Sequence, residues 1–201
     1  MKPHITPYIL AGGQSRRMGQ DKRWLEWNDR KLIDIAIDLA QEATGLSPIL
    51  VGDTFEDSTY RGCKIIPDTA PQKGPLGGLV AALRDCQSEW LLALPVDMPR
   101  LGAVDLHALI SPGNEFPGYK PAVPPLRDAC NHSDAIVFSL DERISPLPMI
   151  VQVKTLPVWE KMLTQGELSL QTGLAQLIVQ KMEYSHHKER LRNINTPNDL
   201  K

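Results

Sequence analysis

A glycine-rich segment near the amino terminus constrains the fold of this chain more than any other feature. Residues 10–22 read Leu-Ala-Gly-Gly-Gln-Ser-Arg-Arg-Met-Gly-Gln-Asp-Lys, and a short apolar run that predicts a strand precedes them. Glycine adopts backbone angles closed to other residues, so consecutive N–H groups can turn inward and form an anion-binding nest. Arg16, Arg17 and Lys22 add positive charge around such a nest. A glycine-rich turn after a strand, followed by cations, indicates a loop that holds a polyphosphate in an α/β fold.

The spacing of these glycines excludes the two commonest phosphate-binding loops. The chain has no Gly-x-x-x-x-Gly-Lys-Ser/Thr sequence and no Gly-x-Gly-x-x-Gly sequence. It therefore carries neither a P-loop nor the dinucleotide-binding fingerprint. An ordinary glycine-rich turn with solvated arginines is the structural alternative.

Strand-like runs alternate with helical patterns along the chain. The predicted strands cover residues 8–10, 48–51, 63–66, 90–94, 135–139 and 149–153, and the predicted helices cover 32–43, 79–86, 156–165 and 170–181, the last interrupted near Gly173. This alternation predicts a three-layer α/β fold, with a mostly parallel central sheet and helices on both faces. Ligands bind such sheets beyond the carboxyl ends of the strands.

The chain shows no internal repeat and no linker that would divide it. Its 201 residues suffice for one domain with a sizeable core, so we expect a single domain over residues 1–201. Residues 111–127 hold five of the 17 prolines and cannot form a regular helix. They predict a long, semi-rigid loop, which is either functional or a plain surface segment.

Composition limits the classes of partner. Hydrophobic residues make up 42% of the chain and the formal net charge is −2. These values are typical of a soluble globular protein and give no reason to expect nucleic acid or an anionic membrane as a partner. No apolar run could span a bilayer and no signal core begins the chain, so we expect a cytoplasmic protein. Cys63, Cys86 and Cys130 lack a Cys-x-x-Cys pair, which favours reduced thiols over disulfides or a zinc site.

A carboxylate between two prolines is the second strong motif. An apolar run over residues 90–94 leads into Pro-Val-Asp-Met-Pro at residues 95–99. The prolines stiffen the turn and present Asp97 in a fixed direction. Mg²⁺ often takes only one or two carboxylates and completes its shell with phosphate and water. Asp97 is therefore the predicted metal ligand; the structural alternative is an aspartate that caps a tight turn.

Two motifs after the strand over residues 63–66 have both a functional and a structural interpretation. Asp68 is either a ligand-binding carboxylate or a solvent-exposed residue at a strand end. Gly77 and Gly78 remove Cβ bulk just before a predicted helix. This allows either a close approach of a ligand to the backbone or close packing of the helix on the sheet.

The chain closes with Asn-Ile-Asn-Thr-Pro-Asn-Asp-Leu at residues 193–200. Thr196 is placed to cap a last short helix, with Asp199 in the position that a capping box uses. Asn195, just before this cap, is a candidate site residue.

The order Leu-Ala-Gly-Gly-x-Ser-x-Arg-Met-Gly-x-Asp-Lys, together with Pro-x-Asp-x-Pro, resembles the molybdenum cofactor guanylyltransferases of the nucleotidyltransferase superfamily. The resemblance covers nearly the whole chain and is weakest over residues 110–190. It implies a Rossmann-like nucleotidyltransferase fold with a nucleotide-binding half (about residues 1–100) and an acceptor-binding half (about residues 101–201). The implied reaction is transfer of GMP from GTP to the phosphate of molybdopterin bearing molybdenum, with release of pyrophosphate.

The resemblance also implies roles for individual residues. Lys22 would stabilise charge on the transferred phosphate, Arg17 would hold the leaving pyrophosphate, and Asp97 would bind Mg²⁺. Nucleotide contacts are expected from Leu10, Ala11, Gly12, Gly13, Lys22, Asp68 and Asp97, and acceptor contacts from Gly77, Gly78 and Asn195. Relatives that select cytidine tend to have Leu-Ala-Ala-Gly, so Gly12 is expected to favour guanine. The implied partners are GTP, the molybdopterin cofactor as acceptor, and molybdoenzyme-delivery proteins.

Three residues depart from the pattern of this family, and two other functions stay open. Val96 stands where cysteine is common, Asp29 where glycine usually makes a turn, and Leu147 where a His-Pro or Gln-Pro-like pair helps form the acceptor side. One alternative is a nucleotidyltransferase that uses CTP or another phosphate acceptor. The other is a nucleotide-binding module without catalysis that acts in cofactor delivery. Lys22 and Asp97 favour an enzyme, because a mere binder needs no catalytic metal.

Overall fold

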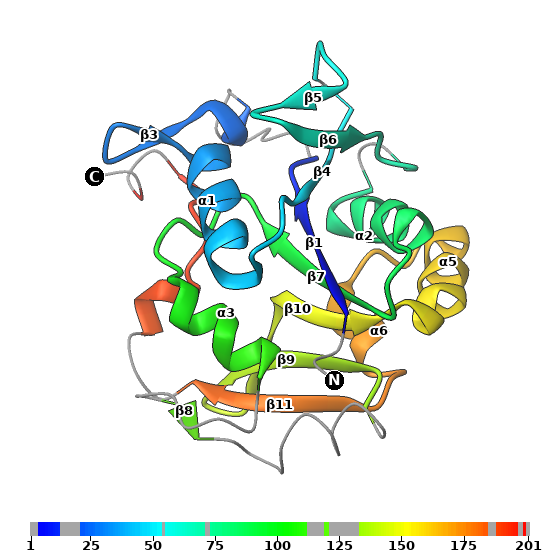
Figure 1. The fold of residues 1–201 in the computed structure, drawn as a ribbon. Coiled ribbons are helices and arrows are strands. Elements are labelled where there is room, and N and C mark those ends of the chain that lie inside the picture. The colour runs from blue at the N-terminus through cyan, green and yellow to red at the C-terminus, as the bar shows by residue number, and fades with distance from the viewer. Residues whose placement is uncertain are drawn as a thin grey trace.

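The chain folds around one large sheet with helices on both faces (Figure 1). The computed structural model describes residues 4–12, 21–53, 55–70, 73–111, 119–120, 133–184, 188–196 and 199. Within these residues the main sheet has nine strands, which lie in the order β5 (Thr59–Tyr60), β6 (Cys63–Ile66), β4 (Ile49–Val51), β1 (Ile5–Leu10), β7 (Trp90–Pro95), β10 (Arg143–Gln152), β9 (Ala135–Leu140), β11 (Val179–Tyr184) and β8 (Tyr119–Lys120).

Most of these strands run in the same direction. Parallel pairings join β6, β4, β1 and β7. β10 is antiparallel to both β7 and β9, and β11 pairs with β9 in parallel, so β9 and β11 also run in the direction of β1. Only β10 and the short edge strands β5 and β8 run the other way among the described strands. The carboxyl ends of β1, β4, β6 and β7 therefore meet at one edge of the sheet.

Each face of the sheet has its own helices and its own apolar core. α1 (Leu32–Thr44) and α3 (Ala103–Ile110) cover one face, and α2 (Pro75–Asp85), α5 (Leu156–Gln165) and α6 (Leu170–Leu174) cover the other (Figure 1). Side chains alternate between the faces along a strand. In β7, Leu92 and Leu94 pack in the core under α1, whereas Leu91 and Ala93 pack in the core under α2. The predicted three-layer α/β fold with a mostly parallel sheet is confirmed.

A small hairpin, β2 (Glu26–Trp27) and β3 (Arg30–Lys31), precedes α1. Its two-residue loop holds Asn28 at φ 49° and Asp29 at φ 60°. Two-residue hairpin loops commonly need positive φ at both positions, and Asn and Asp tolerate this region better than most residues. Asp29 therefore makes the turn where the family pattern has glycine.

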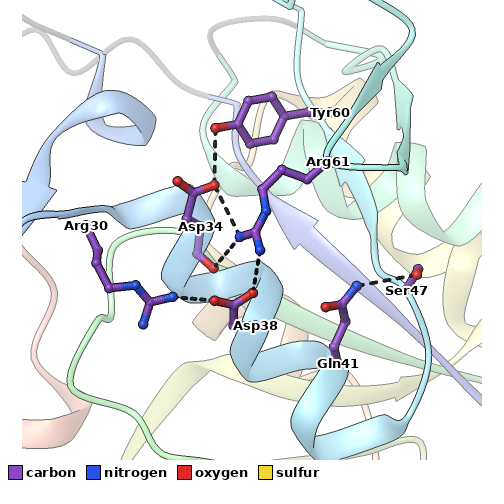
Figure 2. A network of polar contacts seen from close by, with 7 residues as sticks. All are labelled: Arg30, Asp34, Asp38, Gln41, Ser47, Tyr60 and Arg61. Atoms are coloured by element: carbon purple, nitrogen blue, oxygen red, sulfur yellow. Dashed lines mark hydrogen bonds and ion pairs between the residues drawn. The ribbon is translucent and has the colours of Figure 1, made fainter.

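An exposed polar network connects α1 to the edge hairpin formed by β5 and β6 (Figure 2). Tyr60 donates a hydrogen bond to Asp34 at 3.1 Å, and Arg61 donates one to Asp38 at 3.0 Å. Arg30, from β3, pairs with the same Asp38. Exposed pairs of this kind each contribute little to stability, about 0–1 kcal/mol. Their importance lies in linking β3, α1 and the β5–β6 hairpin.

The structure corrects three predicted elements. The helix over residues 170–181 is wrong beyond Leu174, because the chain turns there and residues 179–184 form β11. The helix over residues 79–86 begins earlier, at Pro75, which stands at its first position. The strand over residues 149–153 begins at Arg143, because it forms a hairpin with β9 across a turn at Asp141 and Glu142. Helix α3 and strands β2, β3, β5 and β8 were not predicted.

Other predictions about the chain can also be checked. The helix over residues 32–43 and its Gly45 cap are confirmed, with Gly45 at φ 72°. Cys63 and Cys86 are buried free thiols, whereas Cys130 and most of residues 111–127 lie outside the described residues. In the part of the chain that the structure describes, none of the helices combines the length and apolar character needed to cross a membrane.

Candidate functional site

A cavity of about 260 Å³ opens where β1 and β7 end. Several segments that lie far apart in the sequence line it: Leu10, Ala11, Gly12, Asp21, Lys22, Arg23, Gly74, Pro75, Pro95, Val96, Asp97, Leu147 and Asn193. The carboxyl edge of a parallel sheet is where α/β proteins bind ligands, because strand ends and the following loops converge there. This cavity is therefore the candidate active site.

Lys22 and Asp97 form the polar centre of the cavity. The Lys22 ammonium nitrogen lies 2.8 Å from Asp97 Oδ2, and the two side chains are 20% and 15% exposed. Lys22 also donates a hydrogen bond to Asn195 Oδ1 at 3.1 Å, and Asn193 Nδ2 lies 3.5 Å from Asp97 Oδ2. The structure thus brings together the end of the glycine-rich segment, the Pro-x-Asp-x-Pro turn and the closing asparagine motif.

The Asn-Ile-Asn motif is held in place by its central residue. Ile194 is fully buried in the core under α1, and its backbone N–H donates to the Asp97 carbonyl oxygen at 2.8 Å. Successive side chains of an extended segment point to opposite sides. Burial of Ile194 therefore directs Asn193 and Asn195 away from the core and toward Lys22 and Asp97.

A short helical turn, η1 (Lys22–Trp24), positions Lys22. Asp21 caps this turn: its Oδ1 accepts hydrogen bonds from the Arg23 backbone N–H at 3.1 Å and from Arg23 Nε at 2.9 Å. Arg23 is only 2% exposed, and its guanidinium lies 4.3 Å from the centre of the Phe55 ring. Because Arg23 is anchored inward in this way, the preceding Lys22 is oriented toward Asp97.

Asp68 lies next to the cavity but is buried. Its side chain is 7% exposed, so the alternative of a solvent-exposed strand-end residue is wrong. The Asp68 backbone N–H donates to Asp53 Oδ1 at 2.8 Å, and Asp68 Oδ1 accepts from the Ala70 N–H at 2.8 Å. Burial raises the pKa of the Asp68 carboxyl, the hydrogen bond from Ala70 opposes this, and the charge of Asp53 adds to the rise.

Glycines surround the Asp68 carboxylate. A Cβ on Gly12 would lie 3.2 Å from Asp68 Oδ2, and a Cβ on Gly77 would lie 2.5 Å from Asp68 Oδ1 and 2.7 Å from the Ala70 carbonyl oxygen. Gly77 and Gly78 are buried in the first turn of α2, and neither lines the cavity. Close packing against Asp68 therefore requires glycine at position 77. Contact of Gly77 and Gly78 with an acceptor stays a prediction.

The donor set at Asp97 fits a metal that takes few protein ligands. Among the described residues, no group of three or more His, Cys, Asp or Glu could hold a metal ion. The described contacts of Asp97 all fall on Oδ2, which leaves Oδ1 without a hydrogen bond to the described residues. A single carboxylate oxygen in the cavity is compatible with Mg²⁺ or Mn²⁺, which often take one or two carboxylates and complete their shell with water and phosphate.

Sequence reasoning missed some residues of this region, and some of its candidates cannot be placed. Gly13 and Arg17 lie outside the described residues. Asn193, which lines the cavity, was passed over for Asn195, although its position two residues earlier could have identified it. Leu147, which the resemblance placed on the acceptor side but which was not among the candidate site residues, also lines the cavity, within an irregular part of β10.

The matched family model, together with the mostly parallel sheet and the lysine–carboxylate pair at its carboxyl edge, identifies this protein as a nucleotidyltransferase. The chain belongs to the MobA-like NTP transferase domain family, whose family model matches residues 8–181.

Individual relatives agree with this assignment, and solved structures share the fold. A protein of Nostoc sp. named a probable molybdenum cofactor guanylyltransferase is 30% identical over 199 residues, which cover 98% of this chain and 89% of the relative. The fold resembles molybdopterin-guanine dinucleotide biosynthesis protein A of Archaeoglobus fulgidus, with a TM-score of 0.72 at 22% identity over 97% of this chain and 94% of that one. It also resembles a Mycobacterium tuberculosis protein determined in complex with manganese, with a TM-score of 0.57 at 16% identity over 89% and 87% of the two chains.

Proposed function

We propose that this enzyme transfers GMP from GTP to the phosphate of molybdopterin bearing molybdenum, forming the guanine dinucleotide cofactor and pyrophosphate. The observation that carries the proposal is that Lys22, which lines the cavity together with Asp97, contacts both Asp97 and Asn195. These contacts join three motifs of the resembled guanylyltransferases at the edge where an α/β sheet binds its ligand. The name of the Nostoc relative supports the choice of nucleotide and acceptor.

In the proposed reaction an oxygen of the acceptor phosphate forms a bond to the α-phosphorus of GTP. The bond between that phosphorus and the bridging oxygen breaks, and pyrophosphate leaves with the electron pair. Such a transfer needs little acid–base chemistry, so the protein contributes positioning and charge neutralisation. The Lys22 ammonium neutralises charge on the transferred phosphate, and the buried Arg23 anchor holds Lys22 in place. Arg17 is the expected partner of the pyrophosphate.

We assign Asp97 as the protein ligand of a divalent metal ion, with Mg²⁺ as the expected ion. Two observations on the described residues support this assignment: none of them bonds to Asp97 Oδ1, and they offer no cluster of three or more metal-ligating side chains elsewhere. So does the structural neighbour determined with manganese, since Mn²⁺ and Mg²⁺ favour similar oxygen ligands. When bound, the metal ion supplies charge neutralisation and orientation of the phosphate oxygens.

We propose that the first half of the chain binds the nucleotide and that Gly12 favours guanine. The small residues Ala11 and Gly12 line the cavity and leave room for a purine. A methyl group at position 12 would also press on the Asp68 carboxylate, 3.2 Å away. Gly12→Ala is therefore expected to weaken GTP binding more than CTP binding. One methyl group in a pocket is typically worth about 1–3 kcal/mol of discrimination.

The direct test combines the purified protein with the molybdopterin cofactor, a divalent metal and each of the four NTPs in turn. We expect pyrophosphate release and a guanine dinucleotide product, detected by mass spectrometry, with GTP preferred over CTP. Transfer from CTP, or to another phosphate acceptor, would replace the proposal with the first alternative. Nucleotide binding without pyrophosphate release would favour a non-catalytic module.

We further propose that the protein acts in the cytoplasm and passes its product to molybdoenzyme-delivery proteins. The buried free thiols of Cys63 and Cys86 fit a reducing compartment.

A further inference from the structure

A second cavity, of about 340 Å³, lies beside the candidate active site. Its lining residues are Arg100, Glu189, Arg192, Asn193, Asn195 and Asp199. Asn193 lines both cavities, and Asn195 contacts Lys22 of the first one. The two cavities therefore share Asn193, whose side-chain nitrogen lies 3.5 Å from Asp97 Oδ2, next to the proposed reaction site.

Two guanidinium groups of the second cavity have unused hydrogen-bond donors. Among the described residues, Arg100 makes one side-chain hydrogen bond, a long one of 3.4 Å to the Asp199 carbonyl oxygen, and its guanidinium stacks on the Trp27 ring at 4.3 Å. Arg192 is exposed and makes no side-chain hydrogen bond or ion pair within the described part of the chain. Because each guanidinium carries five N–H donors in a planar fork, both residues can still bind an oxyanion.

The carboxylate of Asp199 is already occupied. Asp199 Oδ2 accepts hydrogen bonds from the backbone N–H groups of Asn195 and Thr196 at 3.0 and 2.8 Å, and from the Thr196 hydroxyl at 2.9 Å. These donors lower the pKa of the Asp199 carboxyl. The positive charge of Arg100 lowers this pKa further, but the larger contributions come from the asparagine motif, which Asp199 therefore braces.

We propose that Arg100 and Arg192 bind the phosphate monoester of the acceptor and hold it against the α-phosphorus of the nucleotide. This inference rests on the proposed function. Attack of one phosphate on another brings two anions together, and their repulsion must be offset on the acceptor side as well as on the nucleotide side. Lys22 serves the nucleotide side. Arg100 and Arg192 are the only cations that line the adjoining cavity among the described residues, and guanidinium groups recognise phosphate through paired hydrogen bonds.

The test measures guanylyl transfer by Arg192→Met and Arg100→Met at saturating GTP, with the acceptor concentration varied. Each variant should raise the acceptor KM by about tenfold to hundredfold, the range expected for a lost hydrogen bond to a charged group. GTP affinity, measured by calorimetry, should stay unchanged. Arg192→Lys should recover part of the loss, because it keeps the charge and loses the fork.

Arg84→Met is the matched control, since Arg84 pairs with Glu160 between α2 and α5 and lines neither cavity. An unchanged acceptor KM in both Arg100→Met and Arg192→Met, or an equal rise of KM in Arg84→Met, would overturn the inference.

A second experiment distinguishes failure of this inference from failure of the proposed function. Inorganic phosphate is titrated by calorimetry into protein saturated with a GTP analogue that cannot be cleaved at the α-phosphorus. If the unmodified protein transfers no GMP to molybdopterin, phosphate binding that weakens in Arg192→Met still supports the anion site, and binding that is absent or unaffected refutes it.

Discussion

The two halves of the sheet bring residues to the same site by different routes. In the first half, β1, β6 and β7 run parallel, and Gly12, Asp68 and Asp97 each follow within two residues of the end of one of them. In the second half, Leu147 lies inside β10, and Asn195 lies on an extended segment that belongs to no strand. Parallel topology alone gathers the first set at one edge, because all the strands end there.

The second half depends instead on contacts between distant residues. β10 runs against its neighbours, and its register with β9 shifts between Ser145 and Met149, beside Leu147. The asparagine motif reaches the site because Ile194 enters the core under α1 and bonds to the Asp97 backbone. Single substitutions should therefore affect the two halves differently: chemistry or nucleotide binding in the first, and acceptor use in the second.

The largest effect is expected at Asp97, on which both halves converge. Asp97→Asn removes the charge that pairs with Lys22 and the proposed metal ligand, so kcat should fall by about 100-fold or more, the scale typical of lost electrostatic stabilisation. The fold should be preserved, because Asp97 lies in a solvent-accessible cavity. Steady-state kinetics and circular dichroism provide the measurements. Near-normal turnover by the folded variant would contradict the role of Asp97.

The next effect tests whether the second half depends on its buried anchor. Ile194→Ala should lower the free energy of unfolding by about 2–5 kcal/mol, as for other fully buried aliphatic residues. Acceptor KM should rise and GTP affinity should change little, because Asn193 and Asn195 lose their support while the first half stays intact. Urea unfolding, calorimetry and kinetics measure the three quantities. Ile194→Val is the control with a small expected change. Equal losses of GTP and acceptor binding would show that the halves are not separable.

A smaller effect is expected from two residues of the second half: Leu147, which lines the first cavity, and Asn195, which contacts Lys22 from the second cavity. Asn195→Ala removes the hydrogen bond to Lys22 and should weaken acceptor use by about tenfold, in line with a hydrogen bond to a charged group. Leu147→Ala should change acceptor KM less, since Leu147 offers only apolar contact where the resembled family has a polar side chain. Steady-state kinetics at saturating GTP, with the acceptor concentration varied, give the acceptor KM of each variant for comparison. A larger effect at Leu147 would show that the acceptor binds through apolar contacts.

The smallest effect concerns pH and the first half. Burial raises the pKa of Asp68 in the folded state, so the folded protein retains this proton to higher pH than the unfolded chain. The contribution of Asp68 to stability should therefore decrease as pH rises from the unfolded value, about 3.9, to the raised value, and then stay constant. Asp68→Asn should remove this dependence. Urea unfolding of both proteins from about pH 4 to pH 8 tests the sign. The prediction would be contradicted if the stability of the unmodified protein, relative to that of Asp68→Asn, increased with pH.

Local sequence was enough to predict most of the first half. The helix over residues 32–43 and its glycine cap follow from apolar periodicity and glycine geometry, which depend on neighbours a few residues away. Residues 170–181 show the limit of such reasoning. They contain spacing compatible with a helix, but after Gly173 the chain forms a strand whose pairing with β9 lies beyond any local window.

The sequence by itself determined the class of site. A glycine-rich loop, a lysine and an aspartate each follow a predicted strand, and residues that follow parallel strands gather at one edge of the sheet. Only the tertiary structure decided that Asp68 is buried among glycines and that two arginines lie beside the cavity. The physical reason is the distance along the chain over which each kind of interaction acts. Strand, turn and loop preferences act over a few residues, whereas burial and the meeting of distant side chains follow from packing of the whole chain.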